Sequence, residues 1–244
     1  MDRRSQRASF FAYADNYLID LKAAIIVDVE ATRAIRQAEV GAARTMIERT
    51  EERLELNPER IAADSAYGSA EMLGWLVNER AIEPHIPVFD KSTRADGTFS
   101  REDFAYDRQS DVYLCPAGKV LASTGTLVND GVTLLYRASK HDCDAFELKP
   151  RCCPKMPSRK VPRSIHEKAR DVAREIAKTD AYVRSRRERK KIEMLFAHLK
   201  RILRLDRLRL RGPLGARDEF LLAATAQNLR KLAKLIPTPA LHPA

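Results

Sequence analysis

The sequence lacks any apolar run long enough to cross a membrane. A membrane-spanning helix needs about 20 consecutive apolar residues, and none of the 244 residues belongs to such a run. The basic N-terminus is also not followed by the apolar stretch of a secretory signal peptide. We therefore expect a cytoplasmic protein with no membrane partner.

Cysteine is scarce, with four residues that all lie between positions 115 and 153. A disulfide scaffold is not expected in a cytoplasmic chain of this size. No Cys-x-x-Cys pair occurs, so the four positions could form only a weak zinc knuckle: Cys115, Cys143, Cys152 and Cys153. We expect these thiols to be buried in the fold or to have no specific role. Zinc is not an expected cofactor.

Acidic residues are rare in one long segment. Residues 149–211 contain 22 Lys and Arg against 7 Asp and Glu, a net charge of 22 − 7 = +15. The whole chain carries +10, so the remaining residues together carry 10 − 15 = −5. Such a concentration of positive charge suits a polyanion, and we expect nucleic acid as the partner.

The first 90 residues alternate between strand and helix patterns. Strands are predicted at residues 10–20, 23–32, 60–63 and 83–88, and helices at residues 39–56 and 69–81. This order predicts an α/β layer around a mixed sheet. Residues 91–163 form a partly β insertion with short strands at 112–114 and 133–136, and helical periodicity returns over residues 164–236. Residues 237–244 are proline-rich and expected to be loose.

Residues 184–210 are predicted to form mostly one long amphipathic helix. Six apolar residues follow the three- and four-residue steps of a buried stripe: Ile192, Leu195, Phe196, Leu199, Ile202 and Leu203. A break is predicted at residues 212–215, followed by a last helix at residues 216–236. Its inward side chains are predicted to be Phe220, Ala223, Leu229 and Leu232.

Two carboxylates stand out in these elements. Glu193 lies four residues after Arg189 and seven before Lys200, so the three form a column beside the apolar stripe. Asp64 follows the strand at residues 60–63, where a carboxylate is well placed for chemistry. The ordinary alternatives are a solvated ion pair for Glu193 and a turn or cap residue for Asp64. Taken together, the two carboxylates could share a pair of Mg²⁺ ions that act on a phosphodiester.

Four segments resemble bacterial insertion-sequence transposases that carry a DDE catalytic domain. They are NYLID…AIIVDVEAT, IAADSAYGSAEML, CPAGKVL and RRERKKIEMLFAHLKRILRLDRLRLRG. The resemblance implies an RNase H-like mixed sheet flanked by helices, with a partly β, cysteine-containing insertion before the C-terminal helices. The implied domains are residues 1–90 (first part of the core), 91–163 (insertion and basic linker) and 164–236 (helical completion of the core).

The resemblance also implies roles for individual residues. Asp64 matches the second catalytic Asp, and Arg189, Glu193 and Lys200 match a signature written Tyr-x2-Arg-x3-Glu-x6-Lys, with Arg186 at the Tyr position. Asp64 and Glu193 are thus the expected catalytic metal ligands of a two-Mg²⁺ site. The expected DNA contacts are Arg184, Arg186, Arg187, Arg189, Lys190, Lys191, Lys200, Arg201 and Arg204. A family cysteine pattern, Cys-x2-Cys-x5-Cys-Cys-Pro, has Phe146 at its second position.

The first catalytic Asp of the family is expected upstream of the sequence in hand, together with a helical DNA-binding region. We therefore expect an N-terminally truncated, C-terminal part of a transposase. Asp20 and Asp28 lie on early strands and are the substitutes that the sequence offers.

These residues predict a DDE transposase catalytic region that cuts transposon ends and transfers the strand into target DNA. Its expected partners are double-stranded DNA and a second copy in a synaptic complex, on the bacterial nucleoid when bound. The alternative is a catalytically inactive, transposase-derived DNA-binding remnant. A basic interaction protein with no catalytic history is a third, weaker alternative.

Overall fold

The structure is a computed structural model that describes residues 12–90, 94–144, 146–205 and 207–236. The chain divides into two compact units. Unit 1 combines residues 1–66 with residues 179–244, and unit 2 comprises residues 67–178. These bounds differ from those of the predicted domains, which remain a prediction, and the predicted tail at residues 237–244 lies outside the described residues.

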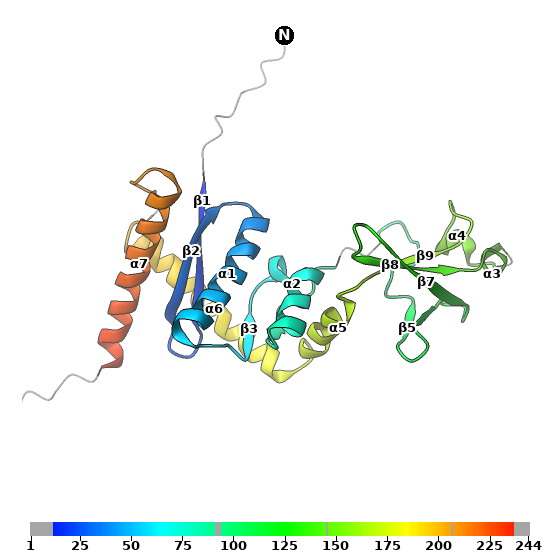
Figure 1. The fold of residues 1–244 in the computed structure, drawn as a ribbon, viewed down its shortest axis with the longest axis horizontal. Helices are drawn as coiled ribbons and strands as arrows, with labels where there is room; N and C mark the ends of the chain where they lie inside the picture. The colour runs from blue at the N-terminus through cyan, green and yellow to red at the C-terminus, as the bar shows by residue number, and fades with distance from the viewer. Residues whose placement is uncertain (1–11, 91–93, 145, 206, 237–244) are drawn as a thin grey trace, which may run out of the picture. The chain divides into compact units, whose positions relative to one another are not determined.

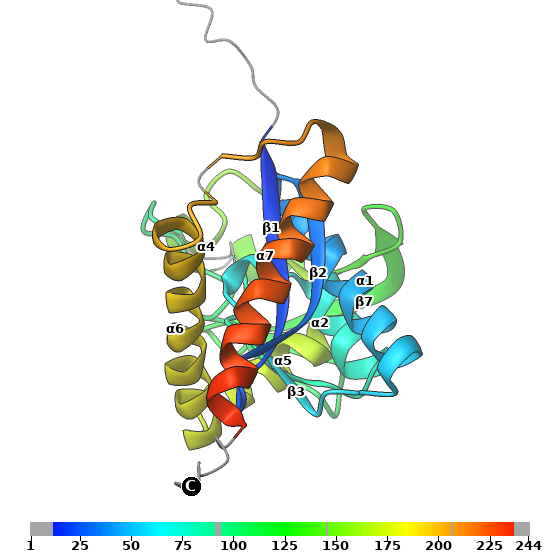
Figure 2. The same ribbon diagram turned by 90° about the vertical axis from the view of Figure 1, so that its left-hand side faces the viewer.

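Unit 1 is built on an antiparallel hairpin of β1 (Tyr13–Asp20) and β2 (Ile25–Arg33), as the sequence predicted. Tyr17 lies opposite Val29, and the register shifts between Leu18 and Ile19. Helix α1 (Arg36–Leu54) covers one face of the hairpin, and α7 (Gly212–Leu235) covers the other (Figures 1 and 2). Strand β3 (Arg60–Ala62) follows α1 and contacts α6 (Asp180–Arg201).

The core of unit 1 joins residues from distant parts of the sequence. Apolar side chains of β2 and α7 form one buried cluster: Ile26, Val29, Ala216, Phe220 and Ala224. The Asn228 side chain of α7 accepts from the Ile26 amide at 2.9 Å and donates to the Ile26 carbonyl at 2.8 Å. Helix α6 lies beside α7 (Figure 2), where Gln227 donates to the Leu195 carbonyl at 2.8 Å. Helix α7 therefore covers the hairpin and completes the core of unit 1.

Helix α6 ends earlier than the apolar pattern predicted. It stops at Arg201, and Ile202 and Leu203 are exposed, so their assignment to the buried stripe is wrong. The amides of Leu203 and Leu205 turn back to the carbonyls of His198 and Leu199. Two of the carbonyls that a helix end leaves open are satisfied in this way, and Arg204 adopts a left-handed conformation, with φ +53°.

Helix α7 begins where a break was predicted. Gly212 and Pro213 form its first turn, because proline fits the start of a helix, where its missing N–H is not needed. Phe220 and Ala223 are buried as expected, but Leu229 and Leu232 are exposed, so their predicted inward orientation is wrong. Apolar residues of α7 lie both on its buried side and on its exposed side. Their spacing in the sequence does not show which of these sides is buried.

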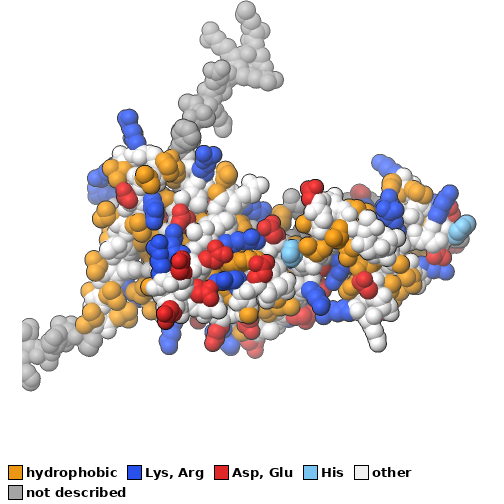
Figure 3. Space-filling view, in the orientation of Figure 1, with side chains coloured by type: hydrophobic (Ala, Val, Ile, Leu, Met, Phe, Trp, Pro, Cys, Tyr) orange, Lys and Arg blue, Asp and Glu red, His pale blue; other side chains and the backbone are white. Residues whose placement is uncertain are grey.

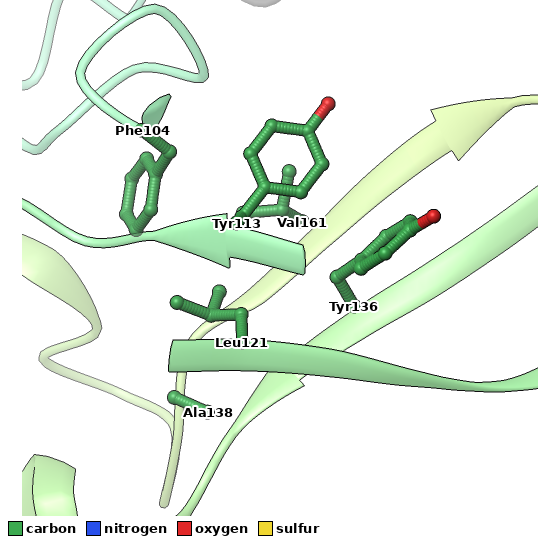
Figure 4. Close-up of a cluster of buried hydrophobic side chains, with 6 residues drawn as sticks. All are labelled: Phe104, Tyr113, Leu121, Tyr136, Ala138 and Val161. Atoms are coloured by element: carbon green, nitrogen blue, oxygen red, sulfur yellow. The ribbon is translucent and has the colours of Figure 1, made fainter. Parts of the chain in front are cut away.

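Unit 2 contains a five-stranded antiparallel sheet in the order β5-β6-β7-β8-β9. The strands are β5 (Ala105–Asp107), β6 (Val112–Leu114), β7 (Val120–Val128), β8 (Thr133–Ala138) and β9 (Lys160–Ser164). Its core is a cluster in which aromatic rings lie against aliphatic side chains (Figure 4): Phe104, Tyr113, Leu121, Tyr136, Ala138 and Val161. Two short helices, α3 (Lys140–Asp144) and α4 (Lys149–Cys152), lie between β8 and β9 in sequence.

The rest of unit 2 is mostly helical. The single turn η1 (Ser65–Tyr67) leads to α2 (Ala70–Gly74), which continues as the π-helical segment η2 (Trp75–Glu79). Ser69 caps α2 as predicted, since its hydroxyl accepts from the Met72 amide at 3.2 Å. Strand β4 (Glu83–His85) and α5 (Glu167–Ile176) complete the unit, and α5 packs on α2.

Gly74 is where α2 and His166 meet most closely. A Cβ added at this glycine would lie 2.3 Å from the His166 Nδ1, so this close approach requires glycine.

The mixed α/β architecture predicted from the sequence is confirmed and is consistent with an RNase H-like fold. Among the described residues, no helix has the length and apolar character that crossing a bilayer would require.

Candidate catalytic and DNA-contact residues

Asp64 lies two residues beyond β3, at the start of a tight turn. Its Oδ1 accepts a hydrogen bond from the Ala66 amide at 2.7 Å, so the ordinary role of Asp as a turn residue is realised. The side chain is exposed. Within the part of the chain that the structure describes, Oδ2 accepts no hydrogen bond. One carboxylate oxygen of Asp64 is therefore fixed by the backbone, and the other is accessible from solvent.

Glu193 lies on the exposed side of α6, beside the buried seam of that helix. The seam is formed by Ser185, Ile192 and Leu199, which recur every seven residues and are at least partly buried. Glu193 is exposed and forms no ion pair within the described residues, although basic residues surround it. Carboxylate oxygens are ligands that Mg²⁺ prefers, and the surrounding Lys and Arg side chains are suited to attract phosphates.

Helix α6 is held by an aromatic stack against β1. The rings of Tyr17 and Phe196 lie 5.2 Å apart and nearly parallel, at 18°. The same helix contacts β3, the strand that leads to Asp64. The elements that carry Asp64 and Glu193 thus contact each other inside unit 1. Across the described residues, however, no three Asp, Glu, His or Cys side chains are grouped as metal ligands.

The two substitutes for a first catalytic Asp are engaged in local structure. Asp20 ends β1, and its carboxylate accepts from the amides of Lys22 and Ala23 at 3.2 and 2.8 Å. Asp28 forms an ion pair with the Arg49 Nε of α1 at 2.7 Å and accepts from the Val29 amide. Both carboxylates therefore stabilise the hairpin and its contact with α1.

The predicted DNA-contact residues line α6 and the segment that follows it. Arg189 is half-buried, and seven others are exposed: Arg184, Arg186, Arg187, Lys190, Lys200, Arg201 and Arg204. None of these eight forms an ion pair within the described residues, so their charge is directed to solvent. The side chain of Lys191 lies outside the described part. Arg186, Glu193 and Lys200 are seven residues apart, about two helical turns, and share one side of α6.

Asp15 is a candidate that the sequence analysis missed. It lies on β1 opposite Ala31, on the hairpin face that packs toward α7. Both of its carboxylate oxygens are buried and have no hydrogen-bond partner among the described residues. Burial raises the pKa of Asp15 to about 7, and the nearby Tyr17 hydroxyl offsets only part of that rise. The strict alternation of Tyr13, Asp15 and Tyr17 in β1 was the available signal.

The four cysteines converge in unit 2. They line one small cavity of about 30 Å³ together with Lys119, Lys149 and Arg159, and none forms a disulfide. The Cys115 sulfur accepts from the Lys119 amide at 3.3 Å. Burial raises the pKa of the Cys153 thiol to about 11, and the neighbouring Cys152 and Cys143 add to the rise. Cys153 is thus held in its protonated form at neutral pH, and the zinc knuckle remains a hypothesis.

Residues 114–233 match a family model described as transposase DDE domain. The matched stretch includes the cysteines, the basic segment, α6 with Glu193, and most of α7, and it leaves Asp64 outside. No curated protein and no solved structure was found to match the chain. Residues 114–233, in the C-terminal part of this chain, belong to the transposase DDE domain family.

Proposed function

We propose that the chain acts as the catalytic region of a DDE transposase that cuts DNA at transposon ends and joins the freed 3′-hydroxyl to target DNA. The observation that carries this proposal is the family match over residues 114–233, which contains an exposed, unpaired Glu193 among basic side chains. Strand transfer needs mainly positioning and charge neutralisation, so few protein groups are required.

Asp64 and Glu193 are the proposed ligands of Mg²⁺. Both carry accessible carboxylate oxygens, and the elements that position them contact each other, so the donor set fits a hard cation. When bound, the metal would supply activation of the attacking oxygen and stabilisation of the leaving oxygen of the phosphodiester. The role of Asp64 is to present Oδ2 while the Ala66 amide holds Oδ1.

The exposed cations of α6 are the proposed contacts to the DNA backbone. Arg189 and Lys200 flank Glu193 by about one and two helical turns, so they would hold phosphates near the scissile bond. The other basic residues would follow the backbone without selecting sequence. The setting would be the bacterial cytoplasm, on the nucleoid when DNA is bound.

A nicking assay on a transposon-end duplex tests this proposal. Cleavage by the full chain should require Mg²⁺ and should be abolished by Glu193→Gln and by Asp64→Asn, while DNA binding persists. Asparagine keeps an oxygen that can accept from the Ala66 amide, so the turn should survive. Glu188→Gln, on the same helix and equally exposed, is the matched control. Full cleavage by the Glu193 variant would remove Glu193 from the proposed site.

The alternative function is a DNA-binding remnant without catalysis. It is favoured by one observation: Asp20 and Asp28 are both engaged in the hairpin, so neither is free to complete a three-carboxylate site. This alternative predicts binding to duplex DNA with no cleavage in Mg²⁺ or Mn²⁺. Metal-dependent cleavage by this chain would rule it out.

A further inference from the structure

The turn that carries Asp64 is held by a side chain from a distant part of the sequence. Arg36 is the first residue of α1 and lies 29 residues before Ser65. Its Nη2 donates to the carbonyls of Ser65 and Ala66 at 3.1 Å each, and its Nε donates to the Ala66 carbonyl at 3.3 Å. Arg36 and residues 64–66 all belong to unit 1. Arg36 thus connects the start of α1 to the turn after β3.

One peptide group of this turn is fixed at both of its ends. The carbonyl of Ser65 and the amide of Ala66 belong to the same planar unit. Arg36 donates to that carbonyl, and the amide donates to Asp64 Oδ1 at 2.7 Å. Rotation of the peptide group would break both hydrogen bonds at once. A carbonyl that accepts from a charged donor also makes the N–H of its own peptide group a stronger donor. The orientation of the Asp64 carboxylate therefore depends on Arg36.

Helix stability does not explain an arginine at the start of α1. The N-terminus of a helix carries partial positive charge, so a cation in the first turn is unfavourable there. Arg36 is exposed, so packing does not explain it either. Figure 3 shows acidic and basic side chains, red and blue, interspersed over α1, and no continuous basic surface there accounts for this residue. What the guanidinium supplies is a planar fork that can span two neighbouring carbonyls.

We propose that Arg36 is a positioning residue for metal binding at Asp64, because it locks the turn that presents Asp64 Oδ2 to the cation. The proposal rests on the proposed role of Asp64 as a Mg²⁺ ligand. A site that is competent in only a fraction of the molecules binds its ligand with an affinity reduced by that fraction. Arg36 raises the competent fraction and needs no contact with the metal.

Amide exchange in the metal-free chain, followed by NMR, tests the hold on the turn. Arg36→Ala should speed exchange of the Ala66 amide roughly tenfold, because the carbonyl of its peptide group loses a charged donor. Arg33→Ala is the matched control, since Arg33 is exposed, lies three residues earlier and carries the same charge. Equal exchange of the Ala66 amide in the wild-type and Arg36→Ala chains would overturn the proposal.

A Mn²⁺ titration tests the effect on the metal without requiring cleavage. Mn²⁺ bound at Asp64 should broaden the NMR signal of the Ala66 methyl group. The Mn²⁺ concentration for half of this broadening should rise about tenfold in Arg36→Ala and about threefold in Arg36→Lys, which keeps the charge but lacks the planar fork. Loss of a nearby positive charge alone would strengthen cation binding. Weaker binding therefore identifies the turn, and not the charge, as the cause.

The nicking assay provides a second readout. The Mg²⁺ concentration for half-maximal cleavage should shift by the same factors as the Mn²⁺ titration, while the cleavage rate at saturating Mg²⁺ stays within about twofold of the wild-type rate. A rate that stays low at saturating Mg²⁺, with unchanged half-saturation, would place Arg36 on the DNA and overturn its role in positioning Asp64. Circular dichroism of each variant checks that α1 is kept.

Asp64→Asn separates this proposal from the proposed function. If Asp64→Asn leaves the Mn²⁺ broadening intact, Asp64 is not a ligand, and the proposed function loses that residue. If Asp64→Asn abolishes the broadening while Arg36→Ala binds Mn²⁺ as tightly as the wild-type chain or more tightly, Asp64 keeps its role and Arg36 is not a positioning residue.

Discussion

At the scale of single residues, Asp15 couples stability to pH. Its pKa rises to about 7 in the folded protein because its carboxylate is buried, whereas the unfolded value is about 3.9. The folded state therefore favours the protonated form. Its stabilising effect is complete below pH of about 4 and is lost as pH rises through about 7.

We predict that the unfolding free energy falls by roughly 2.5 kcal/mol from pH 5 to pH 8 on account of Asp15 alone. Asp15→Asn has no titrating group and should remove that dependence. Urea denaturation of both proteins at several pH values measures the difference. If the two proteins show parallel pH profiles, Asp15 does not titrate as its burial indicates.

Glu167 of α5 is a buried carboxylate that contacts several arginine side chains. It forms ion pairs with Arg101 at 2.7 Å, Arg170 at 3.0 Å and Arg174 at 2.9 Å, and only 1% of its side chain is exposed. The arginines hold the pKa of Glu167 below its ordinary value against the opposing effect of burial. This network ties α5 to the segment before β5.

Glu167→Gln should destabilise the protein by about 3 kcal/mol, because it leaves the largely buried Arg101 guanidinium without its counter-charge. Chemical denaturation followed by circular dichroism measures the loss. Glu175→Gln, which removes an exposed pair with Lys178 on the same helix, should change stability little. Equal effects of the two substitutions would contradict a special role for the buried network.

At the scale of elements, the end of α6 is set by backbone geometry. Arg204 has φ +53°, a conformation that costs a non-glycine residue energy. Arg204→Gly should therefore stabilise the protein by about 0.5–1 kcal/mol in urea denaturation.

The same change should weaken DNA binding if Arg204 contacts phosphate. Arg201→Gly, inside the last helical turn, should instead destabilise by about 1 kcal/mol.

Several elements could be predicted from the sequence because local signals agree with the final packing. The hairpin, α1 and the Ser69 cap follow from β-branched runs, periodicity and capping chemistry. The ends of α6 and α7 could not be predicted in this way. Apolar spacing continues through Ile202 and Leu203, and the turn that ends α6 depends on contacts that spacing does not encode.

Part of the candidate site could also be predicted from the sequence. Glu193 follows from the Arg-x3-Glu-x6-Lys spacing, and the structure shows it exposed on α6. The burial of Asp15 was not predicted, because a strand pattern alone does not tell which faces of a sheet become covered. Here helices cover both faces of the hairpin, so an acidic residue on either side can be buried.

At the scale of the whole molecule, the charge asymmetry predicts the character of DNA binding. The net +15 of residues 149–211 should make affinity fall steeply with salt, with a slope of about −0.9 per phosphate contacted. Arg186→Ala/Arg201→Ala should reduce the magnitude of that slope by roughly 2. Fluorescence anisotropy titrations from low to physiological salt measure it.

The matched control for this titration is Arg33→Ala/Arg53→Ala. Both arginines are exposed and lie outside α6, and the overall loss of charge is the same. If this control lowers the slope as much as the α6 pair, net charge alone governs binding and α6 is not the contact surface.

The paired hydrogen bonds between Ile26 and Asn228 connect positions 202 residues apart. Unit 2 is continuous in sequence, whereas unit 1 combines a segment that precedes unit 2 with a segment that follows it. During synthesis the hairpin is made before α7, which covers it. The hairpin stays uncovered until unit 2 and α6, which lie between them in sequence, have been made. Contacts of such long range form slowly. The nascent protein therefore passes through a period in which the apolar face of β1 and β2 is open, and aggregation or chaperone capture competes with folding.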